Sequence, residues 1–158
     1  MTPGKLRTLP ALLKEVSKVR RSGKSIVFTN GCFDILHVGH VRYLSQAKKL
    51  GDLLVIALNT DSSVRKLKGP ARPVTHQKDR AEVLSSLACV DYILFFNEST
   101  PEKLIHAVRP DVLTKGGDWK VEQIVGGPFV KSYGGKVKSL PFYKGFSTTG
   151  LIEKIRKI

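Results

Sequence analysis

Residues 29–40 read TNGCFDILHVGH and lie between an apolar run at residues 26–28 and a segment with a helical pattern at residues 41–50. The chain therefore passes from a strand, over a short loop that contains glycine, into a helix. A helix that begins in this way directs free backbone N–H groups and the positive end of its dipole outwards. Such a helix start is suited to binding a phosphate group.

Two histidines, His37 and His40, stand three residues apart at this helix start. If the helix begins near Gly39, both imidazoles project on the side of the free N–H groups, and Gly39 leaves no side chain where a phosphate would approach. Histidine donors can stabilise the charge that builds on a phosphoryl group during transfer. A metal site and two ordinary helix-start histidines are the alternatives, but Cys32 stands alone and the other two histidines lie in separate segments.

The segment FDILHVGH at residues 33–40 resembles the signature of the cytidylyltransferase-like nucleotidyltransferases. Three later stretches, RPV at 72–74, KGGD at 115–118 and STT at 147–149, are similar to those of the bacterial D-glycero-β-D-manno-heptose 1-phosphate adenylyltransferases. That family makes ADP-heptose for lipopolysaccharide, and the resemblance extends from about residue 25 to 155. It implies that residues 1–158 form a single nucleotidyltransferase domain that transfers AMP from ATP to the sugar 1-phosphate and releases pyrophosphate.

The resemblance also implies roles for individual residues. His37 and His40 would contact the phosphates at the reacting centre, while Lys68 and Arg80 would neutralise charge on the triphosphate or on the incoming phosphate. Lys66 is the alternative to Lys68. We favour Lys68 because it directly precedes the loop at residues 69–73. A surface cation on a helix is the structural alternative for Arg80.

Further residues would bind the two substrates. The expected contacts to the sugar phosphate are Asp34, Lys66 and Arg72. The expected contacts to ATP are Asn30, Gly31, Cys32, Phe33, Gly39, His40, Lys115, Gly117, Asp118, Ser147, Thr148 and Thr149. Asp34 could equally be a structural turn aspartate, and the Ser-Thr-Thr stretch could simply cap a helix; that last role is compatible with binding.

Mg²⁺ is the implied cofactor, because an ion that bridges phosphate oxygens is the usual means of neutralising a triphosphate. The sequence contains no dedicated metal cage, so most ligands of the ion would be phosphate oxygens and water. Asp34 is a candidate to help to hold it, and we assign no residue as a certain metal ligand.

Length, composition and charge indicate where the protein acts and which partners it binds. A chain of 158 residues can bury a real core, and its longest apolar run, residues 53–58, is too short to span a bilayer. Residues 1–5 lack the apolar stretch of a signal peptide, and the two cysteines form no CxxC pair, so we expect a cytoplasmic protein with reduced thiols. The net charge of +14 predicts attraction to anions. Because neither a basic strand with interleaved aromatics nor zinc-finger spacing is present, we expect small-molecule substrates and no nucleic-acid partner. The short apolar runs predict no membrane partner, and a homo-oligomer is left open.

Hydrophobic periodicity predicts alternating strands and helices. Strands are expected at residues 25–29, 53–58, 92–96, 112–115 and 136–140. Helices are expected at residues 9–19, 41–50, 64–68, 75–87, 102–108, part of 121–133, and 151–158. Thr8, Thr75, Thr100 and Ser147 are the expected helix caps. This order predicts an α/β fold: a Rossmann-like, open, parallel five-stranded sheet with helices on both faces.

Two rival families share parts of this pattern. Class I aminoacyl-tRNA synthetases carry a comparable histidine signature but need a far longer chain. A cytidylyltransferase that acts on glycerol 3-phosphate or a related polyol phosphate is the closer alternative. Those enzymes carry an arginine shortly before the glycine of their last serine-threonine motif, whereas this chain reads FYKGF at 142–146, with Lys144 as the nearest cation. This difference favours the heptose branch.

Overall fold

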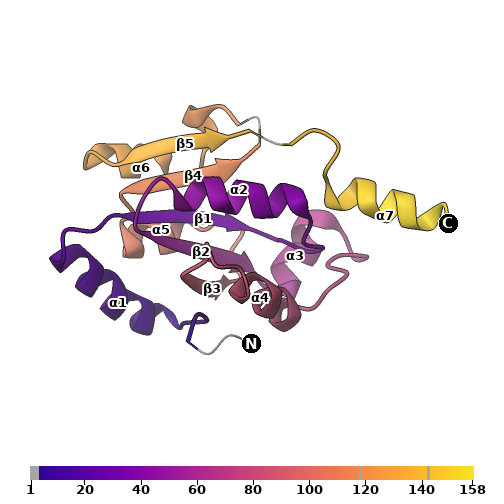
Figure 1. Cartoon of the computed structure of the whole chain (residues 1–158), viewed down its shortest axis with the longest axis horizontal. Helices are drawn as coiled ribbons and strands as arrows, with labels where there is room; N and C mark the ends of the chain where they lie inside the picture. Colours follow the sequence, from indigo (N-terminus) through magenta and orange to yellow (C-terminus); the bar gives the residue numbers. More distant parts are fainter. Residues whose placement is uncertain (1–3, 118, 142) are drawn as a thin grey trace.

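The computed structural model describes residues 4–117, 119–141 and 143–158. Five strands form one parallel sheet in the order β3-β2-β1-β4-β5 (Figure 1). Their bounds are Ile26–Gly31 for β1, Leu53–Asn59 for β2, Tyr92–Phe96 for β3, Val112–Gly116 for β4 and Lys136–Leu140 for β5. The predicted parallel α/β sheet is therefore confirmed.

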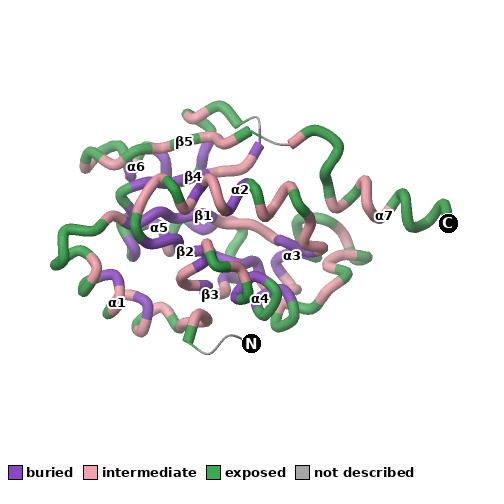
Figure 2. Tube along the Cα trace, in the orientation of Figure 1, coloured by how far each residue is buried: buried purple, intermediate pink, exposed green. Residues whose placement is uncertain are grey.

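Helices cover both faces of the sheet, as predicted (Figure 1). One face carries α2, Val38–Lys48, and α4, Gln77–Ser85. The other face carries α1, Leu9–Arg21, α5, Glu102–Val108, and α6, Gly127–Ser132. The remaining helical segments are α3, Asp61–Lys68, the 3₁₀ turn η1, Val121–Gln123, and α7, Thr148–Arg156. Helix α7 extends away from the rest of the chain, and none of its residues is buried (Figures 1 and 2).

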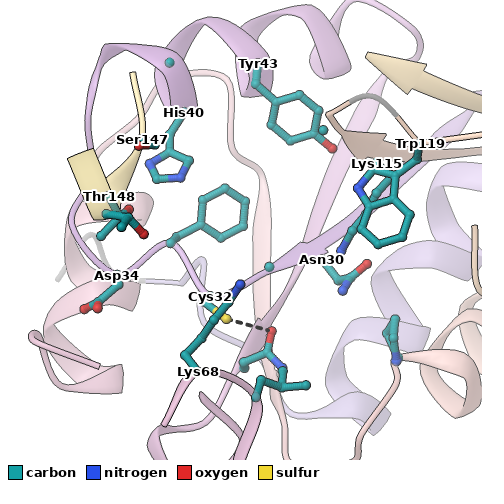
Figure 3. A pocket seen from close by; sticks show the side chains of 18 of the residues that line it. Asn30, Cys32, Asp34, His40, Tyr43, Lys68, Lys115, Trp119, Ser147 and Thr148 are labelled. Atoms are coloured by element: carbon teal, nitrogen blue, oxygen red, sulfur yellow. Dashed lines mark hydrogen bonds between the residues drawn. The ribbon is translucent and has the colours of Figure 1, made fainter. Parts of the chain in front are cut away.

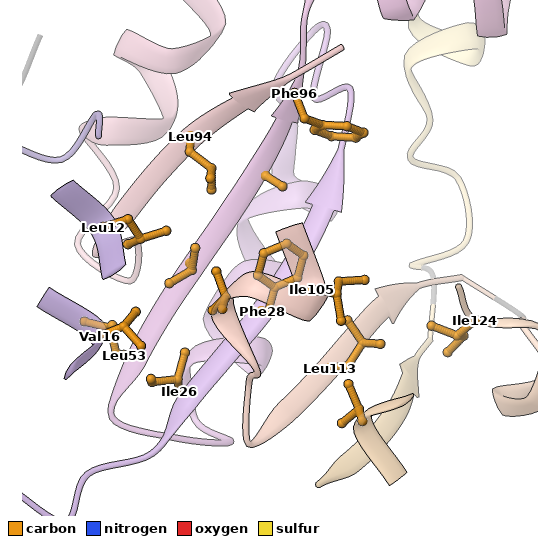
Figure 4. Packing of buried hydrophobic residues seen from close by; sticks show 14 residues of the cluster. Leu12, Val16, Ile26, Phe28, Leu53, Leu94, Phe96, Ile105, Leu113 and Ile124 are labelled. Carbon is orange, nitrogen blue, oxygen red and sulfur yellow. The ribbon is translucent and has the colours of Figure 1, made fainter. Parts of the chain in front are cut away.

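The core consists of two apolar layers, one on each face of the sheet. Alternate residues of a strand point to opposite faces, so Val55 of β2 packs towards α1 and α5 while its neighbour Ile56 packs towards α2 and α4. Figure 4 shows Leu12 and Val16 of α1 directed at the strands. All of β2 is buried, as expected for a strand covered on both faces. Each fully buried leucine or isoleucine contributes about 1.5–3 kcal/mol to folding.

Parallel pairing brings the carboxyl ends of the strands to one edge of the sheet. Central β1 pairs with β2, with Gly31 opposite Leu58, and also with β4, with Phe28 opposite Leu113. The loops that follow β1, β2, β3 and β4 therefore start at the same edge. Open parallel sheets bind ligands at this edge.

Three of the predicted helix caps differ in the structure. Helix α4 begins at Gln77 with His76 at the N-cap, because the Thr75 hydroxyl is bound to Asp34 instead of capping the helix. Helix α5 has Pro101, not Thr100, at its N-cap. Thr8 occupies the N-cap of α1 but makes no capping hydrogen bond through its side chain.

The predicted cap of the last helix is confirmed. The Ser147 side chain accepts a hydrogen bond of 3.0 Å from the Gly150 amide, and α7 starts at Thr148, three residues earlier than predicted. Helix α2 also starts early, at Val38, with His37 at its N-cap.

Candidate active site

A cavity of about 580 Å³ opens at the carboxyl edge of the sheet. Its wall is formed by the loop after β1, the start of α2, the end of α3, the ends of β3 and β4, and the start of α7. The volume is in the range typical of small-molecule sites. Segments far apart in the sequence thus meet at the place where the fold predicts a ligand.

The loop after β1 is shaped by a close contact between Gly31 and Phe33. Phe33 adopts a left-handed backbone conformation with φ of 44°, which is uncommon for a residue other than glycine. A Cβ atom on Gly31 would lie 2.9 Å from the Phe33 ring, so only glycine fits beside it. The Phe33 ring in turn meets His40 edge to face at 5.2 Å between centroids. This packing fixes the direction in which the chain enters α2.

His37 and His40 stack at the start of α2. Their ring centroids are 3.9 Å apart and their planes differ by 23°. Both Nδ1 atoms are buried and have no hydrogen-bond partner among the described residues. Burial lowers the pKa of His37, and burial together with the neighbouring His37 lowers the pKa of His40 to about 4. The neutral form of both rings is therefore favoured, and a bound anion would favour their protonation.

Gly39 has a different role from the one that the sequence suggests. A Cβ atom at this position would lie 2.9 Å from Cε1 of His37 and 3.1 Å from Cβ of Phe146. The space beside Gly39 is thus occupied by protein, not left open for a phosphate. Glycine is needed here because His37 and the chain before α7 pack directly on the helix start.

Three cationic side chains line the cavity: Lys68, Arg72 and Lys115. Lys115 is partly buried, and burial lowers its pKa; the nearby Cys32 opposes this effect, and the positive charge of Lys68 adds to it. Anionic ligands are the natural counterpart of this cluster of Lys68, Arg72 and Lys115.

Burial raises the pKa of the Cys32 thiol, which donates a 3.8 Å hydrogen bond to Oδ1 of Asn59 (Figure 3).

Asp34 is engaged by protein groups. Its carboxylate accepts a 2.6 Å bond from Nε of Arg72 and bonds of 2.8 and 2.9 Å from the amides of Val74 and Thr75. Burial alone would raise the pKa of Asp34, but these donors outweigh it and hold the pKa below its ordinary value. The side chain is fully buried. Asp34 therefore organises the loop at residues 72–75, as a structural turn aspartate would, and offers no free oxygen to a metal ion.

Arg80, unlike Asp34, is not among the residues that line the cavity. Its side chain is fully buried and donates to the carbonyl of Cys32 at 2.5 Å, to Oδ1 of Asp61 at 2.8 Å and to the carbonyl of Thr75 at 3.1 Å. These bonds join the loop after β1 to the starts of α3 and α4. The geometry therefore gives Arg80 a structural role in place of the expected contact with phosphate, and it is not the solvated surface cation that was the alternative.

The other expected residues divide into two groups. Lys66 is exposed on α3 and, like Gly117, lies outside the cavity wall, while Asp118 lies outside the described residues. The remaining expected ATP contacts all line the cavity: Asn30, Gly31, Cys32, Phe33, Gly39, His40, Lys115, Ser147, Thr148 and Thr149. Figure 3 shows Ser147 and Thr148 beside His40, with Lys115 and Trp119 across the cavity.

Several wall residues were not foreseen. Trp119 is 47% exposed and lies 6.0 Å from Nζ of Lys115, measured to the ring centroid. Its place directly after the KGGD stretch was the available signal. Tyr43 is buried behind the cavity, where its hydroxyl bonds with the hydroxyls of Thr29 at 2.5 Å and Thr114 at 3.1 Å. These bonds join α2 to β1 and β4. Their partners lie 14 and 71 positions away, a separation that local periodicity does not reveal.

Comparison with known proteins agrees with this architecture. Residues 28–154 match the family described as cytidylyltransferase-like. The match covers most of the chain, including the stacked histidines and the start of α7. The chain belongs to this family of nucleotidyltransferases.

Within this family, the chain is similar to several individual proteins. The chain is 52% identical over 151 residues to the bifunctional protein HldE of Syntrophotalea carbinolica, and 50% identical over 153 residues to that of Geobacter sulfurreducens. These alignments cover 96% and 97% of this chain but 31% of each relative, so the chain spans about a third of their length. A crystal structure of the lipopolysaccharide core biosynthesis protein from Thermoplasma volcanium is similar with a TM-score of 0.63 and 33% identity, over 78% of this chain and all of that one.

None of the described helices is long and apolar enough to cross a membrane. In the same part of the chain, no three His, Cys, Asp or Glu side chains come together as metal ligands.

Proposed function

We propose that this chain transfers AMP from ATP to D-glycero-β-D-manno-heptose 1-phosphate, giving ADP-heptose and pyrophosphate for lipopolysaccharide core biosynthesis. The observation that carries the proposal is the meeting, in one cavity, of the stacked His37 and His40 with the start of α7 and three cations. The similarity to the Thermoplasma volcanium protein supports the pathway, and the stretches at 115–118 and 147–149 support the substrate.

In the proposed reaction a phosphate oxygen of the sugar attacks the α-phosphorus of ATP. The bond from that phosphorus to the pyrophosphate oxygen breaks, and pyrophosphate leaves. This chemistry needs no protein nucleophile, so binding and charge stabilisation supply most of the rate. His37 and His40 would donate hydrogen bonds to the reacting phosphoryl group, and Lys68, Arg72 and Lys115 would neutralise the charge of the phosphates.

The remaining cavity wall is suited to a nucleoside and a sugar. It combines the hydroxyls of Ser99 and Thr100, the amide of Gln123 and the faces of Phe96 and Trp119. Hydroxyl and amide groups can bond with the hydroxyls of a heptose, and aromatic faces can cover a ring. Binding sites select strongly where buried polar groups would lose their partners with the wrong substrate.

Mg²⁺ is the expected companion of ATP, and the described residues do not form a cage for it. Asp34, the carboxylate within the segment at residues 33–40, is already bound to Arg72 and to two backbone amides. We therefore propose that the ion reaches this site on the phosphate oxygens of ATP and that it would neutralise their charge there.

Transfer of CMP to glycerol 3-phosphate is the second candidate, favoured by the description of the family as cytidylyltransferase-like. One assay separates the two: pyrophosphate release measured with ATP, CTP and GTP, each crossed with heptose 1-phosphate and glycerol 3-phosphate. We expect the highest kcat/KM for ATP with heptose 1-phosphate. An equal or higher value for CTP with glycerol 3-phosphate would overturn the substrate assignment.

A further inference from the structure

Residues 143–149, which lead into α7 and include its first two residues, are attached to the body of the protein through one face of α2. We call these residues the latch segment. It contributes Phe146, Ser147, Thr148 and Thr149 to the cavity wall, yet α7 itself buries none of its residues. The position of this part of the wall therefore depends on the contacts that the latch segment makes before α7 begins.

These contacts come from three positions along one stripe of α2: Gly39, Arg42 and Gln46. Spacings of three and four residues place side chains on the same face of a helix. Nε2 of Gln46 donates a 2.5 Å hydrogen bond to the hydroxyl of Tyr143. Phe146 packs against Gly39: a Cβ atom added to Gly39 would lie 3.1 Å from the Cβ atom of Phe146.

Arg42 is the centre of this stripe. Its guanidinium carbon lies 5.1 Å from the ring centroid of Tyr143 and 5.9 Å from that of Phe146. A planar guanidinium can stack on aromatic faces, which an ammonium group does less well. Arg42 is exposed, and no carboxylate of the described residues forms an ion pair with it. Among the described residues, the rings of Tyr143 and Phe146 are thus the partners of this cation.

We propose that Arg42 is a positioning residue of the active site. By holding Tyr143 and Phe146 against α2, it sets the distance between His40, on α2, and the start of α7, so that both meet the same phosphates of the nucleotide. This role rests on the proposed function. It is separate from the core, because Arg42 and the latch segment contribute nothing to either buried apolar layer.

The test compares Arg42→Ala and Arg42→Lys with the control Arg21→Ala, which removes an exposed arginine from α1 on the opposite face of the sheet. We expect Arg42→Ala to raise the KM for ATP about tenfold, as the loss of two exposed cation–π contacts would, with kcat at saturating ATP changed only a few-fold. The KM for ATP of Arg42→Lys should lie between those of the parent and Arg42→Ala, and the KM of Arg21→Ala should equal that of the parent. All variants should keep the parent melting temperature.

A second readout needs no turnover. Lys144 is exposed within the latch segment, so trypsin should release the fragment 1–144 faster from Arg42→Ala than from the parent, as followed by mass spectrometry. Tyr143→Leu, which removes the facing ring, should give the same change, and the double variant should add little to it.

The outcomes separate this proposal from the proposed function. An unchanged KM for ATP together with unchanged cleavage would overturn the role of Arg42, and so would a lowered melting temperature of Arg42→Ala, which would show that Arg42 stabilises the body of the protein. If the parent itself transfers no AMP, the proposed function fails, while the cleavage rates still report whether Arg42 holds the latch segment.

Discussion

The rings of His37 and His40 lie 3.9 Å apart and nearly parallel, with both Nδ1 atoms buried. Burial lowers the pKa of both side chains, and for His40 the charge that His37 would carry lowers it further. A triphosphate placed beside the rings would reverse this preference. The neutral form of the pair is thus favoured by burial and opposed by nearby phosphate charge.

The first prediction concerns turnover. His37→Ala and His40→Ala should each lower kcat roughly 10²–10³-fold, the scale of losing one donor to the transition state. His106→Ala, which removes an exposed histidine outside this cavity, serves as the control. Steady-state pyrophosphate release measures all three. If both cavity variants stay within a few-fold of the parent, these histidines do not stabilise the reacting phosphoryl group.

The second prediction concerns the pH dependence of stability. The pKa of His40 is about 4 in the folded protein against 6.5 as its ordinary value, so the unfolded chain binds a proton more readily between these limits. The contribution of His40 to the free energy of unfolding should be fully present above about pH 6.5. It should be lost as the pH falls towards 4, at a rate of at most about 1.4 kcal/mol per pH unit.

Urea unfolding at pH 7 and pH 5 measures this effect. The free energy of unfolding of the parent should decrease by on the order of 1–2 kcal/mol between the two, and that of His40→Gln by clearly less. Equal losses in the two proteins would show that His40 is not the group that titrates.

The third prediction separates two neighbouring lysines. Lys68 lines the cavity whereas Lys66 is exposed outside it, although both belong to α3. Lys68→Ala should lower kcat/KM by at least about tenfold, the cost of one lost charge-assisted contact, without changing the melting temperature. Lys66→Ala is the matched control and should behave as the parent. A lower melting temperature of Lys68→Ala together with unchanged kcat/KM would show that Lys68 has a structural role and not a functional one.

The fourth prediction tests the role of Asp34. Asp34→Asn removes the charge that Arg72 and two amides share, and should lower the free energy of unfolding by about 2–3 kcal/mol. The Mg²⁺ concentration that gives half-maximal activity should stay the same. Unchanged stability with a shifted Mg²⁺ requirement would instead identify Asp34 as a ligand of the ion.

Sequence reasoning succeeded where the signal is local. The strand, glycine loop and helix around Gly31 and His40 follow from periodicity within a dozen residues, and the fold built on them is confirmed. The sequence predicts ligand contacts for Asp34 and Arg80 because it does not reveal their distant protein partners: Arg72 is 38 positions from Asp34, and Cys32 is 48 positions from Arg80. An ionisable side chain that is already bound to protein has the same letter in the sequence as one that is free to bind substrate.

The central claim is transfer of AMP to the sugar phosphate, and an isotope label tests it directly. The enzyme is supplied with ATP and with heptose 1-phosphate whose phosphate oxygens are ¹⁸O, and the products are weighed by mass spectrometry. The account predicts ADP-heptose that retains every ¹⁸O atom, together with unlabelled pyrophosphate. Release of AMP without a nucleotide sugar, or the appearance of ¹⁸O in pyrophosphate, would contradict it.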